Sequence, residues 1–173
     1  MQTMKVSGRE ATPEVRITEP GVADGAHMWR LARDSGGLDL NTSYAYLLFA
    51  RDFAATCRIA WLGEEAAGFV LGYLRPEAPD TLFIWQVATS PHARGRSLAS
   101  RMLRDLLAAT GARFIEATIT ADNVASHRLF RSLTKDWPGA EVREAPLFSA
   151  EDFPDNMPAE NLVTVGPFEP GRS

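Results

Sequence analysis

The chain has 173 residues, of which 45% are hydrophobic and 23% charged, and its 22 acidic against 18 basic side chains give a formal net charge of −4. That length suits one globular domain, and the composition excludes a largely disordered chain. Because an acidic protein repels phosphate backbones, we expect no nucleic-acid partner, and the charge favours a cationic substrate.

No export or membrane signal is visible in the sequence. The opening residues, 1–15, lack the apolar segment of a signal peptide, and the longest apolar runs fall far short of the roughly 18 residues of a membrane span. We therefore predict a cytoplasmic protein with no membrane partner. The single cysteine, Cys57, lies in the apolar run 56–61 and is expected to be a buried structural thiol. The three histidines are widely spaced, so we predict no metal site.

Strand and helix patterns alternate along residues 15–168, which we predict to form one domain between a flexible N-terminal arm (1–14) and a C-terminal tail (169–173). In the first half of the chain, the patterns predict a strand at 15–18, a helix capped by Asp24 and centred on 28–32, a helix at 44–53, and a hairpin of strands 56–62 and 66–74 that ends in a turn at 75–80. In the second half they predict a strand at 81–89, a helix at 94–109, a strand at 113–120, and a helix that is capped by Asp122 or Asn123 and ends near Leu133. Two last strands are predicted at 142–148 and 162–168. This order predicts an α/β (α+β) fold with a mixed, mostly antiparallel central sheet flanked by helices.

The strand 81–89 leads through a polar turn into a helix that opens on small and basic residues. A helix N-terminus presents unpaired N–H groups and the positive end of the helix dipole. Small residues let a diphosphate approach the backbone, and arginines add positive charge. The sequence therefore predicts a pyrophosphate cradle, against the simpler alternative of a solvated helix start with two exposed arginines. The predicted cradle comprises Arg94, Gly95, Arg96, Ser97, Leu98 and Ala99.

This segment resembles the acetyl-CoA loop of the GCN5-related N-acetyltransferase (GNAT) superfamily, whose pattern is Arg/Gln-x-x-Gly-x-Gly/Ala. Arg94 and Ala99 match the ends of the pattern, whereas Ser97 stands at the internal glycine. Serine is small enough to preserve binding unless the turn needs a positive φ, which would strain it. The resemblance implies a GNAT fold with acetyl-CoA as co-substrate.

The same resemblance implies further cofactor contacts. Val87 and Thr89 at the end of the central strand would contact the cofactor, and Asn123 would meet its pantetheine or phosphate arm. Phe130 also belongs to this predicted set, at the position where many members carry a tyrosine that protonates the leaving thiolate. Either another group supplies that proton or none is needed, because a thiol with a pKa of about 8.5 is already a tolerable leaving group.

Four further blocks are similar to the L-2,4-diaminobutyrate acetyltransferase family. They lie at 38–48, 79–88, 115–123 and 160–168. The resemblance implies acetyl transfer to the γ-amine of diaminobutyrate in ectoine biosynthesis by a homodimer. It assigns the small diamine to Asp39, Asn41, Trp85 and Glu160, and it places Met157 where the family usually has a histidine.

Charge placement would let the site choose between the two amines of this substrate. Asp39 and Glu160 would keep the α-ammonium protonated and therefore unreactive. Glu116, on one strand face with Thr118 and Thr120, is our candidate base for the γ-amine, although it could equally be a surface carboxylate. Tyr44 is the candidate hydroxyl that holds substrate or protonates the thiolate, unless it merely packs.

The reaction itself is expected to proceed by direct attack of the amine, since Cys57 lies in a different strand. The backbone N–H of Val87 would stabilise the tetrahedral oxyanion. Two alternatives stay open. The chain could be a GNAT enzyme for another amine, such as a polyamine, an aminoglycoside or a protein N-terminus. It could also be a non-catalytic acyl-CoA-binding module, because Ser97, Phe130 and Met157 depart from the expected patterns.

Overall fold

A computed structural model describes residues 13–169 as one seven-stranded sheet with helices on both faces. The strands follow the order β1-β2-β3-β4-β5-β7-β6, and all neighbours are antiparallel except β4 and β5, which are parallel. The strands are β1 (Val15–Thr18), β2 (Arg58–Leu62), β3 (Glu65–Arg75), β4 (Ala78–Thr89), β5 (Phe114–Ile119), β6 (Glu141–Phe148) and β7 (Glu160–Gly166). This confirms the predicted mixed, mostly antiparallel sheet. Residues 1–12 of the predicted arm and 170–173 of the predicted tail lie outside the described range.

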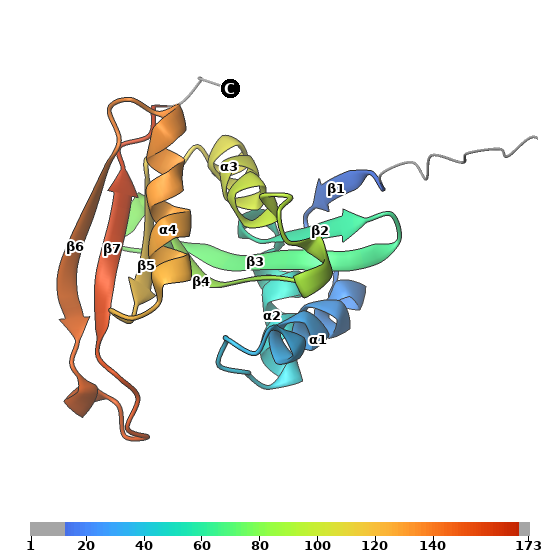
Figure 1. Ribbon diagram of the computed structural model, residues 1–173, viewed down its shortest axis with the longest axis horizontal. Coiled ribbons are helices and arrows are strands. Elements are labelled where there is room, and N and C mark those ends of the chain that lie inside the picture. The colour runs from blue at the N-terminus through green and yellow to red at the C-terminus, as the bar shows by residue number, and fades with distance from the viewer. Residues whose placement is uncertain (1–12, 170–173) are drawn as a thin grey trace, which may run out of the picture.

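Four helices cover the sheet from opposite sides. They are α1 (Gly25–Ser35), α2 (Ser43–Asp52), α3 (Leu98–Thr110) and α4 (Val124–Leu133). Figure 1 shows α1 and α2 below strands β2 to β4, with α3 above them and α4 beside β5 and β7. Two cores result. The larger packs α3 and α4 on the sheet around Leu82, Met102 and Leu106, and the smaller packs α1 and α2 around Met28 and Phe69.

Several predicted boundaries differ from the structure for local reasons. The helix predicted from 94 begins at Leu98, because Gly95 and Ser97 adopt left-handed backbone angles that a helix does not contain. Asp24 stands at the N-cap position of α1, as predicted, but its side chain makes no capping bond to the helix; its carboxylate instead accepts a hydrogen bond from the Gly21 N–H at 2.7 Å, within the preceding 3₁₀ turn. Asn123 does cap α4, since its Oδ1 accepts from the Ser126 N–H at 3.1 Å.

The strand ends also shift slightly. The turn predicted at 75–80 narrows to residues 76–77, so β4 already begins at Ala78. The strand predicted from 56 begins at Arg58, because a short 3₁₀ turn occupies Ala54–Thr56. Within the described part of the chain, no helix is long and apolar enough to cross a membrane.

The parallel pair β4 and β5 separates along its length. Only Thr81–Phe83 pair with Phe114–Glu116, although β4 continues to Thr89 and β5 to Ile119. In Figure 1 strands β2 to β4 run across the view whereas β5, β6 and β7 stand nearly upright. Because the facing backbone groups of β4 and β5 no longer pair with each other beyond this point, the sheet opens into a wedge there.

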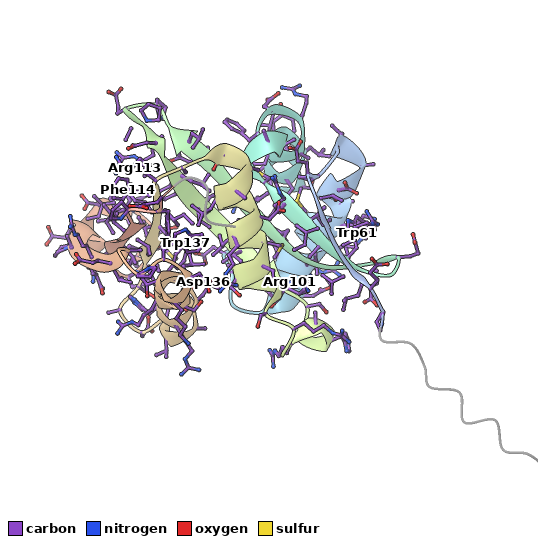
Figure 2. All side chains as sticks on the ribbon, turned by 90° about the horizontal axis from the view of Figure 1, so that it is seen from above. Trp61, Arg101, Arg113, Phe114, Asp136 and Trp137 are labelled. Atoms are coloured by element: carbon purple, nitrogen blue, oxygen red, sulfur yellow. The ribbon has the colours of Figure 1, made fainter. Side chains whose placement is uncertain are left out.

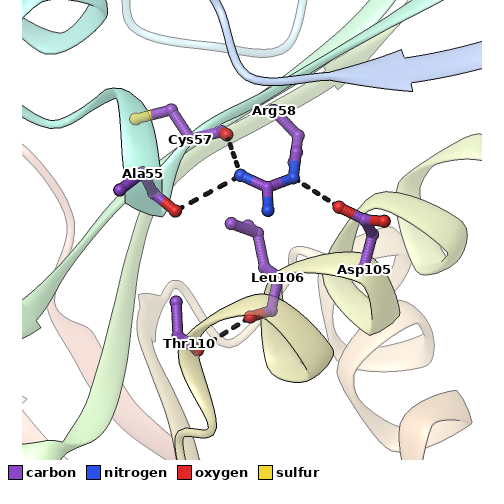
Figure 3. Close-up of polar contacts among 6 residues, drawn as sticks. All are labelled: Ala55, Cys57, Arg58, Asp105, Leu106 and Thr110. Carbon is purple, nitrogen blue, oxygen red and sulfur yellow. Dashed lines mark hydrogen bonds and ion pairs between the residues drawn. The ribbon is translucent and has the colours of Figure 1, made fainter. Parts of the chain in front are cut away.

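A buried arginine ties α3 to the sheet. Arg58 of β2 donates through Nη1 to the carbonyl oxygens of Cys57 at 2.7 Å and Ala55 at 3.2 Å, and its Nε pairs with the Asp105 carboxylate of α3 (Figure 3). Figure 2, seen from above, shows α3 lying over the sheet with Trp61 on one side and Asp136 and Trp137 on the other. A buried guanidinium needs such partners, because an unpaired charge in a protein interior is costly.

We expect Asp105→Ala to lower the free energy of unfolding by about 2 kcal/mol, because it leaves Arg58 buried without its counter-charge. Urea denaturation followed by circular dichroism measures this change. Asp34→Ala is the matched control, since Asp34 pairs with Arg33 at the surface, where ion pairs contribute little. Equal stability of the Asp105 variant and the unmodified chain would contradict the assigned role of the pair.

Candidate functional site

A cavity of about 830 Å³ occupies the wedge between β4 and β5. Most of its lining comes from five segments, which are the two strands, the loop between α1 and α2, α4 with its N-cap residue, and the stretch from the end of β6 to the start of β7, and Tyr73 of β3 completes it. Its lining residues are Gly37–Asn41, Tyr73, Phe83–Val87, Ala117–Thr120, Asn123, Ser126, Phe130, Phe148, Phe153, Asp155, Met157 and Glu160. The cavity therefore gathers side chains from most of the sequence blocks that were singled out above.

The charged lining of this cavity is entirely acidic. Asp39 comes from the α1–α2 loop, Asp155 from the β6–β7 connection and Glu160 from the first position of β7, whereas no lysine, arginine or histidine is among its lining residues. Three carboxylates without a basic neighbour attract a cation and hold an ammonium group in its protonated state. This charge pattern suits an amine that carries positive charge.

Trp85 forms an aromatic wall of the cavity. The register between β3 and β4 shifts here, because Leu71 pairs with Gln86 whereas Gly72 pairs with Ile84, so Trp85 is the bulged residue. Its ring stacks on Phe49 of α2, with the ring centroids 4.9 Å apart and the planes at 24°. The predicted substrate residues Asp39, Asn41, Trp85 and Glu160 all line this one cavity.

The predicted cofactor loop lies where β4 ends and α3 begins. Gly95 has φ = 78° and Ser97 has φ = 54°, both in the left-handed region. Ser97 makes no side-chain capping bond, and its carbonyl accepts the helical bond of Arg101 at 3.0 Å. The first N–H groups of α3 are thus left to a ligand or to water, as a diphosphate cradle requires.

The other predicted cofactor residues lie near the wedge. Val87, Asn123 and Phe130 line the cavity, and Phe130 is also packed into the larger core. Arg94 is exposed and Arg96 is half-buried at the helix start. Thr89 ends β4, where it pairs with Gly68 of β3 and does not line the cavity. Leu98 is buried and Ala99 half-buried in the first turn of α3.

The two candidate proton-transfer groups do not line the cavity. Glu116 is 8% exposed, and its carboxylate accepts bonds from Arg75 Nη1 at 2.9 Å and from the Thr164 hydroxyl at 3.3 Å. Tyr44 is 65% exposed on α2. Glu116 could act on a bound amine only through an intervening water, and the roles of both residues stay predictions.

Sequence reasoning missed several lining residues. Phe148 ends β6, and Phe153 and Asp155 lie in the proline-containing connection that follows it. No spacing rule ties these residues to the central strand, so nothing in the pattern indicates that they line the cavity. Gln86 left a clearer signal, because it is an amide in an otherwise apolar strand and such a group needs buried hydrogen-bond partners.

Metal-ligating side chains and the single cysteine also bear on the chemistry of the site. Within residues 13–169, no group of three or more His, Cys, Asp or Glu side chains is placed to hold a metal ion. Burial raises the pKa of the Cys57 thiol to about 11, so it is almost wholly protonated near neutral pH. A protonated thiol is a poor nucleophile, which agrees with direct attack by an amine.

We expect Ser97→Gly to raise the free energy of unfolding by about 1 kcal/mol, because glycine adopts the left-handed conformation without the steric cost that serine bears. Thermal and urea unfolding measure the difference. Ser97→Ala is the matched control, since alanine keeps the Cβ atom and should bring no gain. A Ser97→Gly variant no more stable than Ser97→Ala would contradict strain at this turn.

Comparison with known proteins identifies the family of the chain. The Acetyltransferase (GNAT) family matches residues 26–134. A protein of Nocardia farcinica named L-2,4-diaminobutyric acid acetyltransferase is 45% identical over 94% of this chain and 84% of its own length. A protein of the same name from Streptomyces coelicolor is 46% identical over 93% of this chain and 98% of its own length.

Solved structures agree with this assignment. Diaminobutyrate acetyltransferase EctA from Paenibacillus lautus, in complex with L-2,4-diaminobutyric acid and coenzyme A, matches with a TM-score of 0.85 and 36% identity over 93% of this chain and 99% of that chain. Ard1 from Thermoplasma volcanium shares the fold at a TM-score of 0.67 and 16% identity over 87% of this chain and 95% of that chain. The chain therefore belongs to the GNAT family of acetyltransferases and, within it, to the relatives named L-2,4-diaminobutyric acid acetyltransferase.

Proposed function

We propose that this chain transfers the acetyl group of acetyl-CoA to the γ-amine of L-2,4-diaminobutyrate, giving N4-acetyl-L-2,4-diaminobutyrate for ectoine biosynthesis. The observation that carries the proposal is the acidic cavity in the β4–β5 wedge, whose charged lining residues are all carboxylates. The N-terminus of α3, which follows β4 and has no side-chain cap, is the proposed site for the diphosphate of the cofactor. The relatives named for this substrate, one of them in complex with diaminobutyric acid and coenzyme A, support it.

Electrostatics would orient the substrate. Asp39 and Glu160 would bind the α-ammonium and keep it protonated, so that it has no lone pair to attack with. Since no basic side chain lines the cavity, neutral donors such as the Asn41 amide would bind the α-carboxylate. The γ-amine would then point toward Trp85 and the open inner edge of β4.

The chemistry is a direct transfer. The γ-nitrogen lone pair forms a bond to the thioester carbonyl carbon, and the carbon–sulfur bond breaks as coenzyme A leaves. The Val87 N–H would stabilise the oxyanion of the tetrahedral intermediate. The nitrogen proton would pass through water to Glu116, and the thiolate would take a proton from Tyr44 or solvent, since Phe130 has no hydroxyl to offer.

We expect Asp39→Asn and Glu160→Gln each to raise the KM for diaminobutyrate about 10- to 100-fold, because each loses a charge-assisted bond to the α-ammonium. The KM for acetyl-CoA should change less than about twofold. Initial rates of coenzyme A release measure both constants. Glu151→Gln is the matched control, because Glu151 is an exposed carboxylate near the cavity that does not line it.

A comparison of several amine substrates distinguishes the proposed acceptor from the alternative acceptors. Spermidine, an aminoglycoside and a peptide N-terminus are compared with diaminobutyrate at equal concentration. A higher kcat/KM for any of these would contradict the proposed acceptor while preserving the acetyltransferase. Tight acetyl-CoA binding without turnover on any amine would instead support a non-catalytic module.

We further propose that the chain acts as a homodimer in the cytoplasm, where acetyl-CoA is available. The edge strand β6 supports a self-association surface, because one side of it has no paired strand in the sheet and Leu147 on it is 46% exposed. Analytical ultracentrifugation should give a dimer for the unmodified chain and a shift toward monomer for Leu147→Lys. Lys135→Glu, at an exposed position in the 3₁₀ turn that follows α4 and outside β6, is a control that should stay dimeric, and a monomeric unmodified chain would contradict the proposal.

A further inference from the structure

A chain of buried hydrogen bonds leads from α2 through β4 to the cavity wall. The Tyr46 hydroxyl donates to Gln86 Oε1 at 3.0 Å, and Gln86 Nε2 donates to the backbone carbonyl of Asp39 at 2.9 Å. Tyr46 is fully buried and Gln86 is 6% exposed. Both ends of the Gln86 amide are therefore used, one toward a helix and the other toward a loop.

The bulge at Trp85 explains how a polar side chain reaches this place. Gln86 pairs with Leu71, and its neighbours belong to the smaller core, where Tyr46 packs edge-on against Phe69 with ring centroids 6.0 Å apart. A buried amide weakens an apolar core unless its donors and acceptor are satisfied. The hydrogen-bond chain is what makes glutamine tolerable at this position.

The orientation of the Gln86 amide is fixed by the backbone carbonyl of Asp39, which can only accept a hydrogen bond and therefore requires the nitrogen end of the amide. The oxygen end then faces Tyr46, whose hydroxyl donates to it. Burial raises the pKa of Tyr46, which keeps the proton of this bond on the hydroxyl.

The loop that receives this bond has few other ties. Residues 36–42 run from the left-handed C-cap Gly36 to the start of α2. Leu38 packs on the smaller core, whereas Asp39 and Leu40 are exposed. Among the hydrogen bonds of the described residues, the bond from Gln86 to Asp39 is the one that joins this loop to the sheet.

We propose that Gln86 is a positioning residue that holds the α1–α2 loop against β4, and thereby keeps the Asp39 carboxylate at the cavity wall, with the Tyr46 hydroxyl bonding the other end of its amide. This inference rests on the proposed function, in which Asp39 binds the α-ammonium of diaminobutyrate. Gln86 also lines the cavity, so a change at Gln86 alone could disturb substrate directly. Tyr46 does not line it, so Tyr46→Phe breaks the hydrogen-bond chain without changing a side chain of the cavity.

The test compares Gln86→Met and Tyr46→Phe with the unmodified chain. Gln86→Met keeps the length of the side chain but removes both hydrogen bonds, and we expect the KM for diaminobutyrate to rise at least 10-fold while the KM for acetyl-CoA stays within twofold. Tyr46→Phe removes only the hydroxyl, and we expect a rise of about threefold. NMR order parameters of the amides at 37–42 should fall from the rigid range, near 0.85, toward about 0.6 in Gln86→Met, with a smaller fall in Tyr46→Phe.

Ile59→Val is the matched control for loss of stability. Ile59 is buried in the same core but bonds to no member of the hydrogen-bond chain, so the change should lower Tm yet leave both KM values and the order parameters of 37–42 unchanged. If Ile59→Val raised the KM for diaminobutyrate as Gln86→Met does, the effect would be general loosening and the positioning role would be overturned.

The order parameters also separate this inference from the proposed function. They require no substrate, so unchanged values at 37–42 in Gln86→Met would overturn the positioning role whatever the enzyme acetylates. Failure of the unmodified chain to acetylate diaminobutyrate would overturn the proposed function, while a fall in the order parameters would still show that Gln86 holds the loop.

Discussion

The separation of β4 from β5 is the constraint on which the site depends. A parallel pair that stayed in register would satisfy its backbone groups and leave no room between the strands. Here the pairing ends at Phe83 and Glu116, and the remaining inner edges face a cavity. Because buried backbone N–H and C=O groups need partners, an opening of this kind is stable only where ligand or water can supply them. The position of the cavity thus follows from the strand pairing of the sheet.

The two faces of the sheet contribute different groups to this opening. The face covered by α3 and α4 carries the left-handed turn at Gly95 and Ser97 and the capped start of α4 at Asn123. The face covered by α1 and α2 carries the loop of Asp39. Under the proposed function, the nucleotide thioester would approach from the first of these faces and the diamine from the second, and the two would meet at the wedge.

The fold could be predicted well from the sequence, because apolar periodicity and turn residues are local signals. The hairpin at Gly63, the central strand ending at Thr89 and the cap at Asn123 all follow from such signals. The sequence predicted less of the site, because a cavity is lined by segments whose distance in space does not follow from their separation along the chain. Strand alternation grouped Glu116 with Thr118 and Thr120, but it could not show that Arg75, 41 residues earlier, pairs with Glu116.

The buried thiol has a practical consequence. Cys57 is the single cysteine of the chain, it is fully buried, and its raised pKa suppresses the thiolate that alkylating reagents and oxidants attack. A cysteine introduced on the surface would then be the one fast-reacting sulfur in the native molecule. Dyes or spin labels could be attached to chosen elements, such as the loop between α1 and α2, without first removing the natural residue.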